Sequence, residues 1–206
     1  DWFNAHKQSY LDAQQNMSDF IDRLIVEMNK HDELDNVSGK KSLYRIYNDV
    51  RFSKDKSPYN VRFAFSLSRS TKLKRGGYYV HIRPGGSYLS CGFFGPNPAD
   101  LNRIRQDIDI NYDQWNKILR SKSIASNFEP LAGDKVLTAP RGFDIKHPGI
   151  DLLRHKQFIL RHYFSDAEVT SSDFLKKVNK TFKAVRPYFD HMSELLTTDL
   201  NGELIV

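Results

Sequence analysis

The sequence contains a single cysteine, Cys91, among 206 residues. One cysteine excludes an intramolecular disulfide and a zinc site built from several thiolates. Because Cys91 lies in an apolar stretch, we expect a small core residue and not a nucleophile. Disulfides are typical of oxidising compartments, so this composition favours a reducing compartment, and we expect a cytoplasmic protein.

Long apolar runs and familiar ligand-binding motifs are also lacking. No run approaches the ~18 residues of a membrane-spanning helix, so no membrane association is expected. No secretory leader opens the chain, although it starts at Asp1 and not at Met, which leaves trimming of an N-terminal segment open. There is no Walker phosphate loop, GxGxxG fingerprint or GxSxG elbow. The histidines are scattered without metal-ligand spacing, so we predict no metal site and assign no cofactor.

The residues that are present suit a folded core. Hydrophobic residues make up 39% of the chain and aromatic residues 13%, which separates it from disordered proteins. The net charge of +6 favours anionic partners. Neither a repeat nor a long linker divides the chain, so we expect residues 1–206 to form a single domain.

Periodicity predicts an α+β fold, with an antiparallel sheet of about four or five strands packed against N- and C-terminal helices. Helical spacing of apolar residues predicts helices over 10–30, 98–109, 112–121, 148–155 and 172–196, and Pro187 should kink or split the last one. Alternation predicts strands over 43–47, 62–68, 77–83, 88–94 and 158–164. The segment Arg83-Pro84-Gly85-Gly86 predicts a type II turn between two of these strands.

The run RIYNDVRFSKDKSPY, residues 45–59, concentrates charge and aromatic side chains. If it is extended, alternate residues share one face, and two guanidiniums flanking a carboxylate could hold a phosphate or carboxylate. The residues of this run that we expect to bind a ligand are Arg45, Tyr47, Asp49, Arg51, Lys56 and Tyr59. An ion-pair lattice that ties a loop to the sheet explains the same pattern, and catalysis by Asp49 or Asp55 is a third interpretation.

A second polar cluster lies in an irregular stretch further along the chain. It contains Arg141, Gly142, Asp144, His147 and Lys156. Arg141 and Lys156 are candidate ligand-binding residues, and His147 is a candidate catalytic residue. A helix cap and a surface lysine are the competing interpretations of His147 and Lys156.

Basic and aromatic residues also surround one predicted hairpin. They are Lys72, Lys74, Arg75, Tyr78, Tyr79, His81 and Arg83. This composition suits a platform for single-stranded nucleic acid. A solvated basic loop beside core-facing tyrosines is the competing interpretation.

Three segments resemble a family of proteins. RIYNDVRFSKDKSPYN, GGYYVHIRPGGSYLSCGFFGP and PRGFDIKHPGIDLLRHKQFI are similar to a widespread bacterial and fungal family of conserved hypothetical proteins, carried as a domain of unknown function. The resemblance covers nearly the whole chain and implies a compact domain with residues preceding Asp1. It implies no activity, and the positions that it highlights largely coincide with the two polar clusters.

Three functional hypotheses therefore stand. The first is a basic pocket for a small anionic ligand, such as one that carries a phosphate, in which Arg51 and Arg141 converge on one cleft. The second is a hydrolase or phosphoryl-processing enzyme that uses Asp49 or Asp55. The third is a nucleic-acid or protein-interaction module that uses the basic hairpin.

Overall fold

A four-stranded antiparallel sheet forms the centre of the protein. The computed structural model describes residues 2–52, 54, 56–199 and 201–205. The strands lie in the order β1 (Phe63–Ser68), β2 (Gly77–Ile82), β3 (Ser87–Phe93) and β4 (Phe158–Phe164). Helices precede and follow the sheet. The fold is therefore α+β, as the sequence predicted.

Helices lie before, between and after the strands in the described part of the chain. They are α1 (Trp2–Ala5), α2 (Lys7–Met28), α3 (Gly39–Ser42), α4 (Pro98–Ile110), α5 (Tyr112–Leu119), α6 (Lys122–Ala125), α7 (Ile150–Leu153), α8 (Asp166–Val169), α9 (Phe174–Ala184) and α10 (Arg186–Thr197). The predicted helix over 172–196 is split in two around Val185, because Pro187 in the first turn of α10 has no N–H with which to continue α9. Of the described helices, none is long and apolar enough to cross a membrane.

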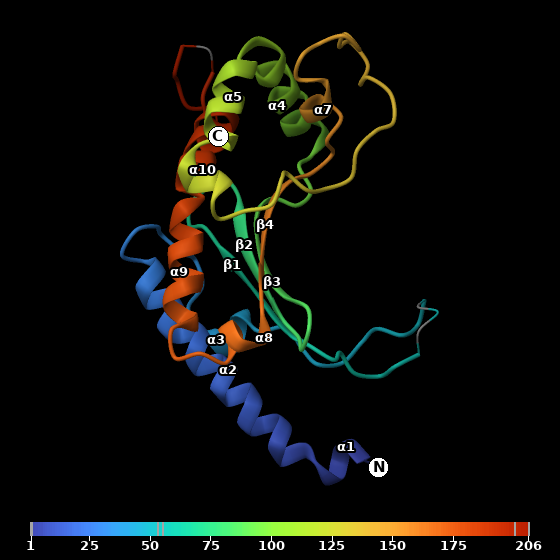
Figure 1. Ribbon diagram of the computed structural model, residues 1–206, viewed down its shortest axis with the longest axis vertical. Coiled ribbons are helices and arrows are strands. Elements are labelled where there is room, and N and C mark those ends of the chain that lie inside the picture. The colour runs from blue at the N-terminus through green and yellow to red at the C-terminus, as the bar shows by residue number, and fades with distance from the viewer. Residues whose placement is uncertain (1, 53, 55, 200, 206) are drawn as a thin grey trace.

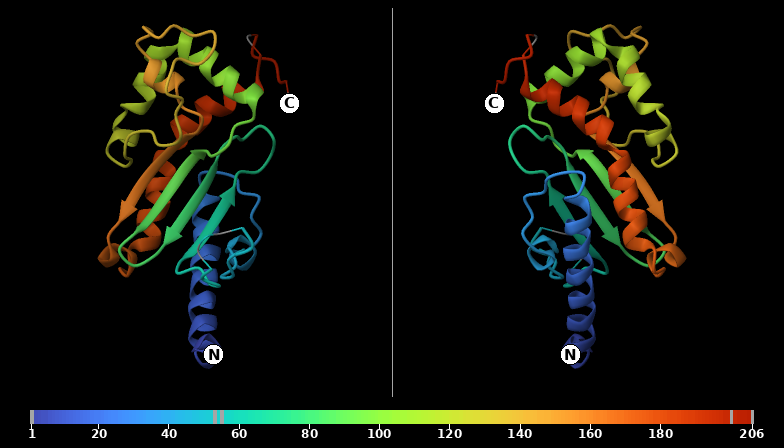
Figure 2. Two further views of the ribbon diagram at one scale, coloured as in Figure 1. Left: turned by 90° about the vertical axis from the view of Figure 1, so that its right-hand side faces the viewer. Right: turned by 90° about the vertical axis from the view of Figure 1, so that its left-hand side faces the viewer.

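The helices cover one face of the sheet and one of its ends. Helices α2 and α9 lie side by side on the first face, α10 continues from the end of α9, and α4, α5 and α7 gather at one end of the strands (Figure 1). At the other end, the chain between α3 and β1 projects as a hairpin beside the N-terminal part of α2. The second face of the sheet has none of the described helices over its middle (Figure 2).

Strand alternation decides which side chains reach the helices. On the first face Phe65, Tyr78, Leu89 and Leu160 are almost completely buried, and the Tyr78 ring lies 4.7 Å from that of Phe182 on α9. Apolar burial of this kind contributes about 25 cal/mol per Å² to folding. It anchors the first face and leaves the alternate residues of each strand on the second face.

Two short segments protect the outer strands. Residues 43–47, predicted as a strand, form only isolated bridges, Leu43 to Phe65 and Tyr47 to Tyr59. The regular ladder is interrupted between these bridges, so the fifth strand is absent from this stretch. At the opposite edge Ala132 bridges to Ile159 of β4.

A buried ion cluster joins the segment that follows α2, the residue that follows β1, and the start of α10. The Asp32 carboxylate accepts hydrogen bonds from Arg69 Nε at 2.8 Å and the Tyr78 hydroxyl at 2.6 Å. Arg186 on α10 lies 2.8 Å from the other oxygen of Asp32. The side chains of Asp32 and Arg69 are 0% and 1% exposed. Buried charges need such partners, because desolvation is costly.

Candidate functional site

The two polar clusters predicted from sequence lie at opposite ends of the sheet. Residues 45–59 lead towards the start of β1, whereas 141–156 lead to the start of β4. In the antiparallel register, the start of β1 lies beside the end of β2. The start of β4 lies beside the end of β3, and these two lie at the opposite end of the sheet from the start of β1. Strands of six or seven residues separate the ends by about 20 Å, and three inter-strand spacings separate the edges.

The expected convergence of Arg51 and Arg141 on one cleft is therefore not what the structure shows (Figure 1). The sequence argument relied on the two segments being neighbours. A meander places β1 and β4 on opposite edges, and these segments enter from opposite ends. The candidate residues accordingly divide into two separate groups.

Within the described part of the 45–59 hairpin, one pair of opposite charges forms and one lysine bonds a backbone carbonyl. Arg51 donates from Nε and NH2 to the Asp49 carboxylate, at 3.0 and 2.7 Å, and both side chains are exposed. These hydrogen bonds lower the pKa of Asp49. Lys56 Nζ donates to the Val50 carbonyl at 2.9 Å. Asp49 and Arg51 therefore form a local ion pair within the hairpin, and Asp55 lies outside the described residues.

Aromatic contacts tie the hairpin to the N-terminal helices. Tyr59 stacks on Phe3 at 4.3 Å and lies 5.5 Å from Tyr47 between ring centroids. A cavity of about 340 Å³ beside them includes Asp49, Tyr59 and Arg62 in its lining. Arg45 is exposed, and its charge also favours the ionised form of Asp49.

In the second cluster, His147 organises its own loop. Its Nδ1 accepts from the Gly149 N–H at 2.9 Å, so Nε2 carries the proton and donates to the Asp109 carbonyl at 3.2 Å. Both ring nitrogens are thereby engaged with backbone groups. Arg141 and Lys156 are exposed at this end of the sheet.

The basic hairpin predicted for nucleic acid has two of its cations paired. Lys74 pairs with Glu33, and Arg75 pairs with Asp100. A lysine or arginine that is already paired with a carboxylate attracts a phosphate group only weakly. Tyr78 from the same stretch faces the core. Other aromatic and basic side chains lie on the second face of the sheet, towards the opposite end of the strands.

Aromatic side chains line that second face in two neighbouring rows. The register places Ala64, His81, Tyr88 and Tyr163 side by side across the four strands, and Tyr44 N–H donates to the Ala64 carbonyl at the edge. The next row along the strands contains Ser66, Tyr79, Ser90 and Arg161. We call the side chains of Tyr44, Tyr79, His81, Tyr88, Arg161 and Tyr163 the aromatic platform.

The rings of the aromatic platform contact one another continuously. His81 stacks on Tyr88 at 4.7 Å with an interplanar angle of 14°, and the Arg161 guanidinium lies 4.9 Å from the Tyr88 ring centroid. The remaining neighbours are 5.9–6.4 Å apart between ring centroids: Tyr44 with Tyr79, Tyr79 with His81, Tyr79 with Tyr88, and Tyr88 with Tyr163. Tyr44 and Tyr163 at the two ends are 48% and 54% exposed, so the platform is open to solvent.

Positive charge surrounds the aromatic platform. Arg62 hydrogen-bonds the Tyr79 side chain, and burial followed by the nearby Arg62 and Arg83 charges lowers the pKa of His81. The two rows contain no aspartate or glutamate. Among the described residues, Arg62, Arg83 and Arg161 form no ion pair with a carboxylate. An anion approaching this face therefore meets three guanidiniums without acidic partners.

The sequence analysis found only part of this platform. Alternation over residues 77–83 placed Tyr79, His81 and Arg83 on one face, but their neighbours come from β3 and β4. Arg161 and Tyr163 lie about eighty residues further along the chain. The available signal was the polar, aromatic alternate face of each strand, which repeats in Tyr88 and again in Arg161 and Tyr163.

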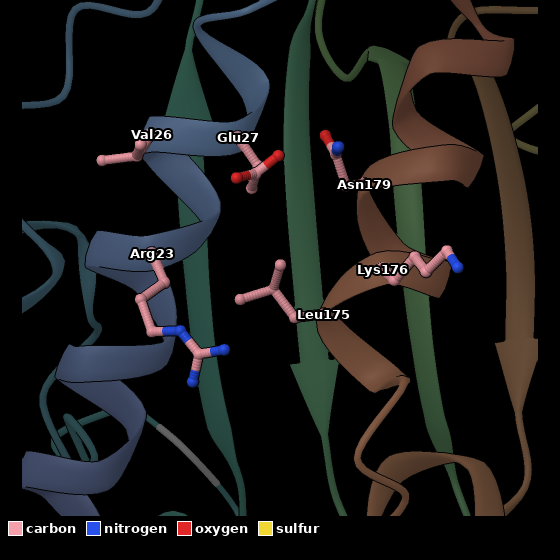
Figure 3. A pocket seen from close by; sticks show the side chains of 6 residues that line it. All are labelled: Arg23, Val26, Glu27, Leu175, Lys176 and Asn179. Atoms are coloured by element: carbon pink, nitrogen blue, oxygen red, sulfur yellow. The ribbon is translucent and has the colours of Figure 1, made fainter.

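Other surfaces offer less chemistry. A groove of about 300 Å³ runs between α2 and α9, with the Leu175 side chain lying between the helices and Arg23 on the α2 side (Figure 3). In the part of the chain that the structure describes, no group of three or more histidine, cysteine or acidic side chains is arranged to hold a metal ion.

Comparison with known proteins places the chain in a family. The model of the conserved hypothetical protein family DUF2461 matches residues 1–191. The chain belongs to this family, which is one of unknown function. Searches of the curated proteins and of the solved structures found no significant match.

Proposed function

We propose that the protein binds single-stranded nucleic acid on the aromatic platform. The observation that carries the proposal is a continuous row of exposed and half-buried rings across the sheet, with Arg161 among them and Arg62 and Arg83 beside them. None of these arginines pairs with an acidic side chain in the described part of the chain. Stacking on aromatic rings and contact with basic groups are the two interactions by which proteins hold unpaired strands.

The dimensions of the platform suit more than one base. Tyr44 and Tyr163 are separated by four inter-strand spacings of about 4.8 Å, or about 19 Å. Sheets of this kind stack two or three bases side by side. The bases of a duplex are covered by their own stacking, so the platform should favour unpaired strands.

The 45–59 hairpin flanks one end of this surface. We propose that this run is the signature of the family, and that exposed Arg45, next to Tyr44 in the chain, contacts a phosphate of the bound strand. Arg141 and Lys156 lie at the far end of the sheet and have no part in this mode of binding. We propose that residues 1–206 form one cytoplasmic domain.

The enzyme and small-ligand hypotheses have weaker geometric support. Asp49 is held by a bidentate contact with Arg51. Both ring nitrogens of His147 are engaged with backbone groups, one in its own loop and one on α4. A pocket built on Arg51 and Arg141 requires two groups that lie at opposite ends. Among the described residues, Arg62, Arg83 and Arg161 at the aromatic platform form no ion pair with a carboxylate.

Binding of labelled single-stranded oligonucleotides, followed by fluorescence anisotropy, tests the proposal. Four phosphate contacts, one from each of the three arginines at the platform and one from Arg45, predict that log K falls with log salt with a slope of about −3. Replacing Arg161 with alanine should reduce the slope by about 0.7, and replacing Tyr79 with alanine should weaken binding about 5- to 150-fold, the equivalent of one lost stack.

The matched control is Arg23→Ala, which removes the same charge from the α2–α9 groove on the helix-covered side (Figure 3). It should change affinity much less than Arg161→Ala. Absence of binding between about 50 and about 200 mM salt, or equal loss in both arginine variants, would refute a site on the platform.

A further inference from the structure

The chain beside the Tyr44 end of the aromatic platform contains a change of register. Leu43 bridges to Phe65 and Tyr47 bridges to Tyr59. Three residues, 44–46, therefore face five residues, 60–64. The two extra residues form a bulge, a feature that redirects side chains and is common beside binding sites. Here Val61 is 75% exposed, and Arg62 reaches Tyr79 of the platform.

The bulge opens a cavity next to the platform. Its volume is about 260 Å³, and Ile46, Phe63, Ile82 and Tyr10 supply apolar walls. Tyr44 also lines it, as does Arg62. The Arg62 guanidinium donates from NH1 to the Asn60 side-chain oxygen at 2.5 Å. The cavity thus shares Tyr44 and Arg62 with the surface that we assign to the bound strand.

We propose that this cavity accepts one base of the bound strand, turned out of the stacked row at Tyr44. This inference rests on the proposed function. A base is planar and largely apolar on its faces, which suits walls formed by Tyr10, Ile46 and Phe63. Its sugar and phosphate stay outside, where Arg62 supplies positive charge. Specific recognition of single strands commonly uses bases that are splayed out in this way.

The alternative occupants of the cavity make different predictions. A small apolar molecule would bind without an oligonucleotide and would not depend on Arg62. A base of the strand binds only as part of the oligonucleotide, and its contribution disappears when that base is missing. Oligonucleotides with one abasic position therefore identify the occupant.

The experiment measures the affinity of short oligonucleotides of about four to six nucleotides, each with one abasic position. The variants are Ile46→Trp, which fills the cavity, and Leu137→Trp, which adds the same ring at a site that is 95% exposed. Wild type and Leu137→Trp should lose about fivefold or more in affinity at the position whose base enters the cavity. Ile46→Trp should bind the intact strand with about the affinity that wild type has for that abasic strand. Removing the base at that position should not lower the affinity of Ile46→Trp further.

A second variant keeps the test valid if Ile46→Trp does not fold. Pro84→Trp narrows the cavity from the β2–β3 turn and should give the same abasic profile as Ile46→Trp. If wild type binds oligonucleotides but both filling variants keep its affinity and its profile, the cavity is not a base site while the platform proposal survives. If wild type binds no oligonucleotide, both proposals fall.

Discussion

Replacing Asp32 with asparagine should lower the free energy of unfolding by about 3–5 kcal/mol, the usual cost of breaking a buried ion pair from one side. The asparagine side chain has nearly the same shape but no charge. It would leave the Arg69 guanidinium, 1% exposed, without its close carboxylate. Asp190 lies 3.7 Å from Arg69 and 3.0 Å from Arg186, so we expect the lower half of this range.

Urea unfolding and calorimetry measure this cost. For a domain of this size, 1 kcal/mol corresponds to about 2–4 °C in Tm, so Tm should fall by roughly 6–16 °C. The control is Asp151→Asn, which removes a carboxylate that is 83% exposed and 3.6 Å from Arg154, and should cost less than about 1 kcal/mol. Equal losses in the two variants would refute the role assigned to the buried cluster.

The difference between wild type and Asp32→Asn should also depend on pH. Burial alone would raise the pKa of Asp32, but the Tyr78 hydrogen bond and the Arg69 charge outweigh it, and the pKa is lowered. A carboxyl group with a lowered folded-state pKa contributes stability above its unfolded pKa of about 3.9, and that stability is lost as pH falls through the folded value. The two unfolding curves should therefore converge below about pH 4. A constant difference down to pH 2 would contradict this origin.

Two further predictions concern the sheet. Oligonucleotide affinity should rise as pH falls through the His81 titration. Burial and the Arg62 and Arg83 charges disfavour the protonated His81 ring in the free protein, whereas a bound phosphate favours it. If a His81→Gln variant gives the same pH profile in anisotropy as wild type, His81 is not the group responsible. Gly92→Ala should lower the free energy of unfolding by about 2 kcal/mol or more. Gly92 has φ +146°, and an added Cβ would collide with the Phe158 carbonyl oxygen. An unchanged urea midpoint would contradict that contact.

Local patterns predicted the elements well because each pattern is contained in a short stretch of chain. Alternation located β4 at residues 158–164, and Asn97 caps α4 by accepting from the Asp100 N–H at 2.8 Å. The predicted type II turn is present, with Gly85 at φ +68° and a hydrogen bond from the Gly86 N–H to the Arg83 carbonyl. Each feature depends on neighbours within a few residues.

The arrangement of the candidate site was much harder to predict, because it depends on strand order and register. The density of charge in residues 45–59 indicated a site, yet Asp49 and Arg51 neutralise one another locally. The aromatic platform gathers single residues from strands that no contiguous motif joins. Tyr88 and Tyr163 become neighbours only when β3 pairs with β4. No local sequence pattern predicts that pairing.

The order of the strands along the chain has a consequence for the folding pathway. Short connections join β1 to β2 and β2 to β3, whereas 64 residues, 94–157, separate β3 from β4. Closing a long loop costs more chain entropy than closing a short one, so we expect the β1–β3 meander to assemble first and β4 to join late. Arg161 and Tyr163 would then be the last members to reach the platform. Pulse-labelling hydrogen exchange should protect the amides of β4 after those of β2.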